Sequence, residues 1–470
     1  MKTKNEYDYI VVGSGAAGGI IFNELKKENK DVLLIEEGNY LDLKSYDFYQ
    51  SLKNFWKSSG YQYANGNIYL PLLQGISVGG STRINGSIMQ PLNENFLKKI
   101  NEYLNLKLNF FNFEKFNQYQ NELIEELKIS RNNNTEIQNN KINEFVKKLG
   151  WECKSQLRTA LDDKNKKNVD IGNSIENLIL KKFNKKEILY NFKVSRLILE
   201  NNKILGVNCF NKITKKKIFI KVNKKVIVCC GAIGSAKLLN DSKIQNQNIG
   251  KKFSCHLSGA IDSIFDIKEN IQLPSDEVEI ITKNELFKKF ASQKVPDEII
   301  LSRLPIRKEN FLLSQNSILS WVYNVSSLSS GIMSKNIFGY KVKFNLSEIE
   351  FQNIKNFIKL ISNFLFNLGA QKVYPNIINK NFKGNNFENI NQILNEIEPE
   401  DLLLTASHLY GTCCFGSNYK NGVVDKNFKV FNYDNLFVVD SSIFPFPTES
   451  NPQLTIMIFA KAASELILNE

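Results

Sequence analysis

The sequence has little of what usually builds metal centres, disulfide frameworks and membrane spans. It contains only two histidines, and its seven cysteines are an odd number without the paired spacing of a zinc site. No stretch offers the roughly 20 uninterrupted apolar residues that a transmembrane helix requires. These absences argue against a metal site, a disulfide-rich secreted domain and an integral membrane segment.

We expect no signal peptide at the amino terminus. It reads MKTKNEYDYIVVGSG and passes from a few polar residues directly into an apolar stretch. That order leaves no room for the apolar region and cleavage site of a signal peptide. A reducing, cytoplasmic location is therefore the expectation.

Positive charge is in excess, but not in the pattern of a nucleic-acid-binding surface. The formal net charge is +13, and the lysines are scattered among asparagines and isoleucines along the whole chain. No basic stripe with interleaved aromatic residues stands out. We interpret the charge as a solvated lysine-rich surface and expect no nucleic-acid partner, although a docking patch for an acidic partner stays open.

The length and the local patterns indicate an α/β protein with two structural units. At 470 residues the chain exceeds the ~250–300 residues at which one hydrophobic core usually stops growing. Short β-branched runs between 186 and 222 predict an antiparallel meander. Residues 226–239 predict a strand that returns to a parallel sheet and continues through Gly231 into a helix.

Two further elements are predicted in the second half of the chain. Apolar spacing near 351–368 predicts an amphipathic helix. Residues 435–440 predict a strand that leads into a turn rich in proline and serine. Asn451 followed by Pro452 then predicts the start of a helix, with Asn451 as its N-cap.

The first 36 residues are typical of a βαβ unit. Residues 9–12 and 32–35 are apolar and β-branched, and a helical pattern separates them. A G-x-G-x-x-G turn lies directly between the first strand and the helix. Glycines there permit a tight turn and the close approach of a pyrophosphate to the helix N-terminus. The turn and the helix start contain Gly13, Gly15, Ala16, Ala17 and Gly18.

The second strand of this unit ends in Glu36. An acidic side chain at that place can accept hydrogen bonds from the ribose hydroxyls of an adenine dinucleotide. The fingerprint does not decide between FAD and NAD, and a Gly-rich turn without a ligand is the alternative.

Four motifs in order along the chain resemble the glucose-methanol-choline (GMC) oxidoreductase family. They are the βαβ unit, GISVGGSTRINGSIM, VIVCCGAIGSAKLL and NLFVVDSSIFPFPTESNPQLTIMIFAKAASELI. The resemblance implies an FAD-binding Rossmann-like domain, of the GMC and p-hydroxybenzoate-hydroxylase type, with an inserted α+β substrate domain. The FAD domain would be discontinuous, with residues 1–95, 155–259 and 406–470, and the substrate domain would take 96–154 and 260–405.

The resemblance also implies which residues contact FAD. The third motif departs from the family pattern, because Ser235-Ala236 and Ser242-Lys243-Ile244 replace its usual sequences. Some relatives attach FAD to a histidine in the loop after Gly80, and this loop has none, so non-covalent FAD is expected. The implied contacts are Gly79, Gly80, Ser81 and Asn85 along the flavin, Val194 at the adenine, Asp440 and Ser441 near the pyrophosphate and ribityl chain, and Pro452, Gln453 and Thr455 at the flavin ring. Gly231, where the third motif enters its helix, is a further expected cofactor contact.

The implied catalytic residues are His408 and Asn451. His408 lies in TASHLYGTCCFG, which is similar to the family segment that carries the catalytic histidine, and Asn451 matches a position occupied by histidine or asparagine. An imidazole can accept the hydroxyl proton of an alcohol near neutral pH. An amide can hold the alcohol oxygen while charge builds on it. For His256, where Cys255 replaces an acidic residue of the family, we expect a structural role, and for Cys413 and Cys414 a packing role.

The expected activity is therefore the oxidation of an alcohol CH–OH group to an aldehyde or ketone by an FAD-dependent oxidoreductase. The electron acceptor would be O2, a quinone or another compound, and we slightly favour a dehydrogenase over an oxidase. Two alternatives stay open: a flavin-dependent lyase similar to hydroxynitrile lyases on the same scaffold, and a non-catalytic flavoprotein. The sequence does not name the alcohol.

Overall fold

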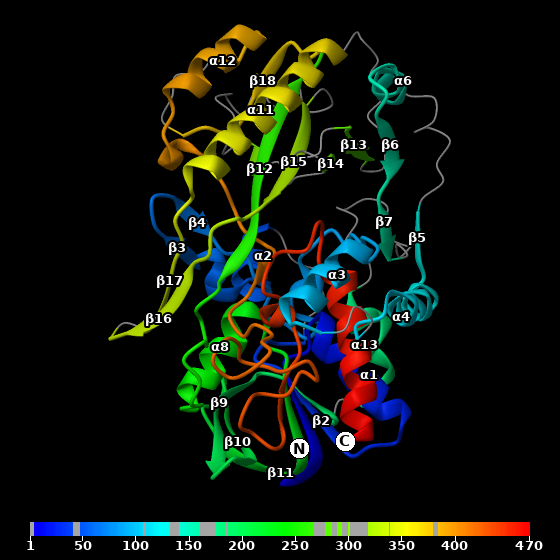
Figure 1. Cartoon of the computed structure of the whole chain (residues 1–470), viewed down its shortest axis with the longest axis vertical. Coiled ribbons are helices and arrows are strands. Elements are labelled where there is room, and N and C mark those ends of the chain that lie inside the picture. The colour runs from blue at the N-terminus through cyan, green and yellow to red at the C-terminus, as the bar shows by residue number, and fades with distance from the viewer. Residues whose placement is uncertain are drawn as a thin grey trace.

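Three distant parts of the chain supply the strands of the first large sheet. In the computed structural model this sheet lies at the same end of the molecule as both chain termini (Figure 1). The structure describes residues 4–40, 48–106, 110–131, 141–159, 174–184, 186–266, 278–283, 289–293, 299–300, 318–337, 339–378 and 384–470. The strand order is β8-β2-β1-β11-β10-β9, with β20 paired to the end of β11. The bounds are Glu6–Val12 (β1), Val32–Ile35 (β2), Ile188–Leu189 (β8), Phe192–Glu200 (β9), Lys203–Asn211 (β10), Lys217–Val228 (β11) and Leu436–Val438 (β20).

The predicted βαβ unit and the return to the parallel sheet are confirmed, with two changes. β1 pairs in parallel with β2 and with β11, and β11 pairs in parallel with β20. The predicted separation of the meander from the strand at 226 is wrong, because β11 runs unbroken from the antiparallel meander into the parallel sheet. The meander also begins later than predicted, since β8 pairs in parallel with β2.

Helices cover this sheet and bring the carboxy terminus back beside the amino terminus. α1 (Ala16–Lys27) and α13 (Gln453–Asn469) pack against each other, and α8 (Gly231–Asp241) packs against β9. Phe459 of α13 contacts six other phenylalanine rings at centroid distances of 4.9–6.4 Å. This aromatic cluster fixes α13 on α3 (Glu94–Tyr103), α4 (Phe113–Glu126) and the turn after β20.

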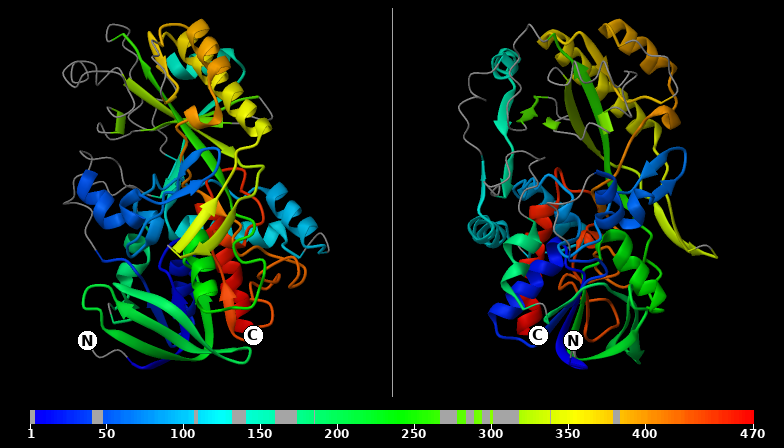
Figure 2. Two further views of the ribbon diagram at one scale, coloured as in Figure 1. Left: turned by 90° about the vertical axis from the view of Figure 1, so that its left-hand side faces the viewer. Right: turned by 180° about the vertical axis from the view of Figure 1, so that it is seen from behind.

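A second large sheet occupies the opposite end of the molecule (Figure 1). Its long strand β12 crosses from the middle of the molecule into that sheet, and β19 pairs with the beginning of β12. α11 (Glu348–Leu368) and α12 (Phe387–Glu396) lie along this sheet, and the two further views show the same arrangement (Figure 2). The strand order is β18-β12-β15-β14-β13-β6, with bounds Lys372–Tyr374, Ser254–Ile264, Ile318–Ser326, Lys289–Gln293, Val278–Ile281 and Glu152–Ser155, and β19 is Leu409–Tyr410.

The remaining elements are short. A four-stranded sheet joins the hairpin β16-β17 to β3-β4, and β5 pairs with β7. Tyr340 of β17 donates a hydrogen bond from its hydroxyl to Asp241 of α8, which docks the hairpin on the first sheet's helix. Among the described residues, no helix combines the length and the apolar character needed to cross a bilayer. The bounds are Ile332–Asn336 (β16), Gly339–Lys343 (β17), Tyr63–Asn65 (β3), Tyr69–Pro71 (β4), Ile129–Arg131 (β5), Leu157–Thr159 (β7), Phe48–Phe55 (α2), Lys141–Lys148 (α6) and Ile175–Leu178 (α7).

The amphipathic helix predicted near 351–368 is confirmed as α11, Glu348–Leu368, and α12, Phe387–Glu396, was not predicted. α11 begins with a capping box, in which Ser347 and Glu350 satisfy each other's backbone N–H groups. The fully buried Glu350 carboxylate also accepts hydrogen bonds from the backbone of Leu328 and Ser329. Burial raises the pKa of Glu350, but the hydrogen bonds from Ser329 and Ser347 lower it more, so the net pKa is below the ordinary value.

Glu350→Gln is expected to lower the free energy of unfolding by about 2 kcal/mol at neutral pH, because an amide cannot accept all of these hydrogen bonds. A carboxyl whose pKa is depressed by folding stabilises the protein above its unfolded pKa, ~4.3, and loses that contribution as the pH falls through its folded pKa. The difference between wild type and variant should therefore shrink below about pH 4. Urea unfolding at several pH values measures it, with Glu348→Gln, an exposed neighbour, as the control. A pH-independent difference would contradict the ionised carboxylate.

Candidate active site

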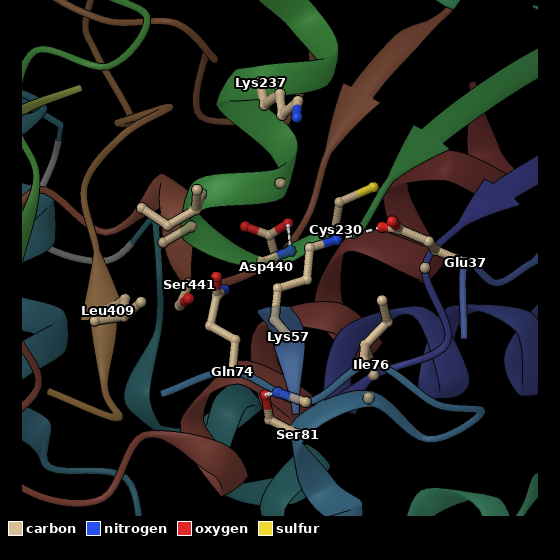
Figure 3. Close-up of a pocket in the computed structure, with 18 of the residues that line it drawn as sticks. Glu37, Lys57, Gln74, Ile76, Ser81, Cys230, Lys237, Leu409, Asp440 and Ser441 are labelled. Atoms are coloured by element: carbon tan, nitrogen blue, oxygen red, sulfur yellow. Dashed lines mark hydrogen bonds and ion pairs between the residues drawn. The ribbon is translucent and has the colours of Figure 1, made fainter. Parts of the chain in front are cut away.

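A cavity of about 880 Å³ opens where the first sheet's turns meet the loop after β4 and the segment around His408. Figure 3 shows part of its lining, with Asp440 and Ser441 beside the start of α8 and Ser81 on the opposite side. Three of the residues predicted from the sequence do not line it: Gly18, Gly79 and Thr455. The predicted residues that do line it are Gly13, Gly15, Ala16, Ala17, Glu36, Gly80, Ser81, Asn85, Val194, Gly231, His408, Asp440, Ser441, Asn451, Pro452 and Gln453.

The three glycines of the turn serve different physical needs. A Cβ on Gly13, whose φ is +100°, would lie 2.3 Å from the carbonyl oxygen of Cys229, and one on Gly18 would lie 1.8 Å from that of Gly13. Both positions therefore need glycine for backbone packing. A Cβ on Gly15 would have no protein atom closer than 4.0 Å, so this glycine keeps the cavity open instead. α1 begins directly after Gly15, and the N–H groups of its first turn lack partners within the helix.

Glu36 ties the Gly-rich turn to its surroundings. Its Oε2 accepts hydrogen bonds from the backbone N–H of Ser14 at 3.0 Å and from the Ser14 hydroxyl at 2.7 Å, and its Oε1 accepts from the N–H of Gly38 at 2.7 Å. The Ser14 hydroxyl oxygen in turn accepts from the N–H of Gly79 at 3.0 Å. Burial raises the pKa of Glu36, against the effect of these bonds. A carboxylate accepts about four bonds, so one acceptor site of Glu36 stays open.

Gly79 thus donates its hydrogen bond from behind the cavity wall. Its neighbour Gly80 brings the loop after β4 against the βαβ turn. Gly80 has φ +55°, and a Cβ there would lie 2.9 Å from the Cα of Gly15. A buried ion pair between Arg83 and Glu176 holds the loop from the other side, with 4% and 3% of the two side chains exposed. Sequence reasoning missed this pair, because nothing local links residues so far apart in the chain.

Asp440 connects the carboxy-terminal turn to the start of α8. Its Oδ2 accepts hydrogen bonds from the N–H of Gly231 at 2.9 Å and from the Ser235 hydroxyl, and its Oδ1 accepts from the N–H of Ser442 at 2.8 Å. Burial raises the pKa of Asp440 despite these bonds. The start of α8 departs from the family pattern at Ser235-Ala236. The hydrogen bond between this helix start and the Asp440 carboxylate is present nevertheless.

A cluster of charges lines the cavity near Val194 and was also missed. Glu37 is paired with Lys57 and lies 3.8 Å from the Nζ atoms of both Lys193 and Lys212. Burial raises the pKa of Glu37, but these lysines lower it more, so its pKa lies below the ordinary value. The only sequence signal is the Glu-Glu doublet that ends the second strand.

His408 lies beside the other histidine of the chain. Its Nδ1 is 2.9 Å from the Nδ1 of His256, and the Nε2 of His256 is 2.7 Å from the carbonyl oxygen of Thr448. The pairing of β12 with β19 and a hydrogen bond of 3.0 Å from the His256 N–H to the His408 carbonyl fix the two residues side by side. Burial and the neighbouring His256 hold the pKa of His408 well below its ordinary value.

Asn451 lines the same cavity as His408, but it does not cap α13 as predicted. The residue that precedes the helix is Pro452, at φ −84° and ψ −9°, and no side chain caps the helix start. The first backbone hydrogen bond of α13 runs from the N–H of Ile456 to the carbonyl oxygen of Pro452 at 2.8 Å, so Pro452 holds the N-cap position and Asn451 lies one residue before it. The Asn85 amide donates to the Oε1 of Gln453 and accepts from the N–H of Ser87 at 3.0 Å, so those groups are already engaged.

Comparisons with known proteins agree with this arrangement. The family model described as GMC oxidoreductase matches residues 7–258 with its amino-terminal part and 336–460 with its carboxy-terminal part. The chain belongs to the GMC oxidoreductase family. An uncharacterised GMC-type oxidoreductase of Sinorhizobium fredii is 24% identical over 99% of this chain and 95% of its own length. A long-chain-alcohol oxidase of Arabidopsis thaliana is 22% identical over 97% of this chain and 68% of its own.

A solved structure likewise shares the fold. Formate oxidase of Aspergillus oryzae, from work on FAD modification in that enzyme, has a TM-score of 0.78 and 13% identity, and the match covers 100% of this chain and 99% of the other. Structural neighbours and the GMC family model establish the mixed α/β fold and support FAD as the cofactor. The donor set fits this cofactor, because Gly15 leaves space at a helix N-terminus and Glu36 keeps a free acceptor site. Within the described residues no group of three or more His, Cys, Asp or Glu side chains could hold a metal ion.

The Gly-rich turn offers a test, because Gly15 borders the cavity whereas Gly18 packs against the backbone. Gly15→Ala is expected to weaken FAD binding at least tenfold, or ~1.4 kcal/mol, because the methyl group fills space left for the cofactor. The thermal midpoint of the apoprotein should stay unchanged. Gly18→Ala should instead lower that midpoint, because its methyl group meets the Gly13 carbonyl. Flavin fluorescence titration and thermal unfolding of both variants measure the two effects, and equal behaviour of the variants would refute the distinction.

Proposed function

We propose that this chain is an FAD-dependent oxidoreductase that oxidises the CH–OH group of an alcohol to an aldehyde or ketone. The observation that carries the proposal is that the dinucleotide turn at Gly15 lines the same cavity as His408 and Asn451. GMC family membership supports it, as do relatives named long-chain-alcohol oxidases. FAD, when bound, supplies the acceptor for a hydride from the alcohol carbon.

The residues proposed to hold FAD surround that cavity, and three further predicted positions would support it from outside. Gly15 and the first turn of α1 would receive the pyrophosphate, and Glu36 the ribose. Ser81 and Asn85 would lie along the flavin, and Gly79 would support them from behind. Thr455 would lie behind the start of α13. Gly18 would support the turn from outside the cavity. The remaining proposed contacts are Gly13, Ala16, Ala17, Gly80, Val194, Gly231, Asp440, Ser441, Pro452 and Gln453.

The division of the chain into two domains is part of the same proposal. Residues 1–95, 155–259 and 406–470 would form the FAD-binding domain, and 96–154 and 260–405 the substrate domain. In support, every strand of the first sheet comes from the first set of residues. β12 begins in the first set and ends in the second, so it would connect the two domains.

His408 is the proposed base. Because its pKa is depressed, its imidazole is neutral at pH 7 and can accept the hydroxyl proton of the alcohol. The Asn451 amide would donate a hydrogen bond to the alcohol oxygen, where negative charge builds as that proton leaves. Both groups line the cavity in which the substrate would bind.

His408→Ala is expected to retain FAD but to slow alcohol-dependent flavin reduction by about 10²- to 10⁴-fold, which is the usual contribution of a general base. The measurement is the loss of flavin absorbance after anaerobic mixing with a panel of short, long-chain and aryl alcohols. Ser407→Ala, the adjacent cavity residue, serves as the control. Unchanged flavin reduction in His408→Ala would contradict the role of the base.

The same panel separates the alternatives. Flavin that stays oxidised with every alcohol, together with cleavage of a cyanohydrin, would favour the lyase. Neither activity would favour a non-catalytic flavoprotein. Admitting oxygen to the reduced protein and following reoxidation then distinguishes an oxidase from a dehydrogenase that needs a quinone or another acceptor.

Non-covalent attachment of FAD is a separate part of the proposal. The cavity-lining loop 73–88 contains no histidine that could form a covalent bond to the flavin. Acid precipitation of the purified protein is therefore expected to release all flavin absorbance into the supernatant. Flavin that stays with the pellet, and with the protein band in a denaturing gel, would refute this expectation.

A further inference from the structure

The environment of His256 determines where its ring carries hydrogen. The Nε2 atom is 2.7 Å from the carbonyl oxygen of Thr448, and a carbonyl oxygen can only accept a hydrogen bond. Nε2 must therefore carry a hydrogen. The side chain is 1% exposed, so exchange of this contact for a water molecule is disfavoured.

His256 carries only that one hydrogen at neutral pH. Burial lowers its pKa to about 4, with a smaller contribution from the charge of Lys289, and the hydrogen bond to Thr448 opposes these effects. The ring is therefore neutral, and its Nδ1 is a bare acceptor. This excludes the opposite arrangement, in which a charged His256 would donate from both ring nitrogens.

The acceptor on His256 then decides the state of His408. The two Nδ1 atoms are 2.9 Å apart, so one of them must donate, and only His408 can do so. We propose that His256 is a positioning residue that holds His408 as the Nδ1–H tautomer, so that Nε2 of His408 is the atom that accepts the substrate proton. Nε2 has no hydrogen-bond partner among the described residues, and the ring lines the cavity.

The surrounding contacts keep the pair of histidines rigid and connect it to the loop that carries Asn451. The β12–β19 pairing holds the two histidines at fixed spacing, and the ring planes are nearly perpendicular at 84°. The Thr448 hydroxyl donates to the carbonyl of Ser450 and accepts from the hydroxyl of Tyr410 at 2.8 Å. His256 is thus hydrogen-bonded to Thr448, and the loop that begins at Thr448 leads directly to Asn451.

The role in proton transfer rests on the proposed function, but the tautomer assignment does not. In the reaction, the alcohol would lose its hydroxyl proton to Nε2 of His408 and a hydride from its carbon to the bound FAD. His408 would then be an imidazolium whose Nδ1–H still donates to His256. The acceptor on His256 therefore stabilises the charged form without a change of hydrogen-bond direction.

The tautomers can be observed directly, because the chain has only two histidines and so only four ring nitrogens. FAD-loaded protein labelled with ¹⁵N-histidine is examined by NMR at about pH 7.5, above the ordinary histidine pKa of ~6.5. Protonated and bare ring nitrogens resonate in separate regions of the spectrum. We expect one ring protonated at Nε2, assigned to His256, and one at Nδ1, assigned to His408. His408 protonated at Nε2, or His256 protonated at both nitrogens, would overturn the proposal.

Variants of His256 test the consequence for the proton transfer. His256→Leu removes the acceptor, and the limiting rate of flavin reduction should fall at least about tenfold, with the ~10⁴-fold loss of a wrongly held catalytic histidine as the upper bound. Substrate affinity should stay within about twofold. His256→Asn, which can place an oxygen where Nδ1 lies, should recover part of the rate and part of the Nδ1–H signal of His408.

The outcomes distinguish this inference from the proposed function. The expected ¹⁵N pattern in a protein whose flavin no alcohol reduces would support the tautomer and refute the alcohol oxidation. Alcohol-dependent reduction with His408 protonated at Nε2 would refute the tautomer alone. A His256→Leu variant that reduces flavin at the wild-type rate would refute the positioning role. The wild-type spectrum decides the tautomer even where that variant does not fold.

Discussion

The position of β11 between β1 and β20 is the constraint on which the rest of the structure depends. All three strands run parallel here, and their registers bring Val12, Val228 and Val438 to the same edge of the sheet. Because the carboxyl ends of parallel strands share one edge, the turns that follow them must meet there. The Gly-rich turn, the start of α8 and the turn at Asp440 are therefore neighbours, although they lie more than 200 residues apart in sequence. The main cavity opens at this edge.

Buried carboxylates then hold these turns together. Glu36 and Asp440 each accept hydrogen bonds from two backbone N–H groups and a serine hydroxyl, and each joins segments that the strands alone would leave separate. Burying a carboxylate is costly, and the raised pKa of each group expresses that cost. The hydrogen bonds offset it only while the turns keep their geometry. The same groups that make the edge polar enough for a cofactor thereby also make it rigid.

The sequence predicted what depends on local pattern and on ordered motifs. The strands, the roles of Gly13 and Gly18 in a tight turn, and helix α11 follow from spacing over a few residues, and the family resemblance named the segments that carry His408 and Asn451. What the sequence did not predict depends on contacts between distant segments. Arg83 with Glu176, Glu37 with its lysines, and His256 with His408 are pairs for which no local pattern exists. The N-cap error at Asn451 has a local cause, because the carbonyl of Pro452, and not that of Asn451, accepts the first hydrogen bond of the helix.

The pairing of the two histidines also bears on how His408, the proposed base, could be both half-buried and effective. Burial keeps the His408 imidazole neutral, which is the form that accepts a proton, but it also disfavours the cation that results. A neighbour that only accepts at Nδ1 compensates for this, because the hydrogen bond it receives becomes stronger when His408 is charged. His256 can serve in that way only while Thr448 holds its other nitrogen, and β12 carries His256 at the point where this strand leaves for the second sheet. The chemistry of the proposed base would therefore depend on where one strand crosses from one sheet to the other.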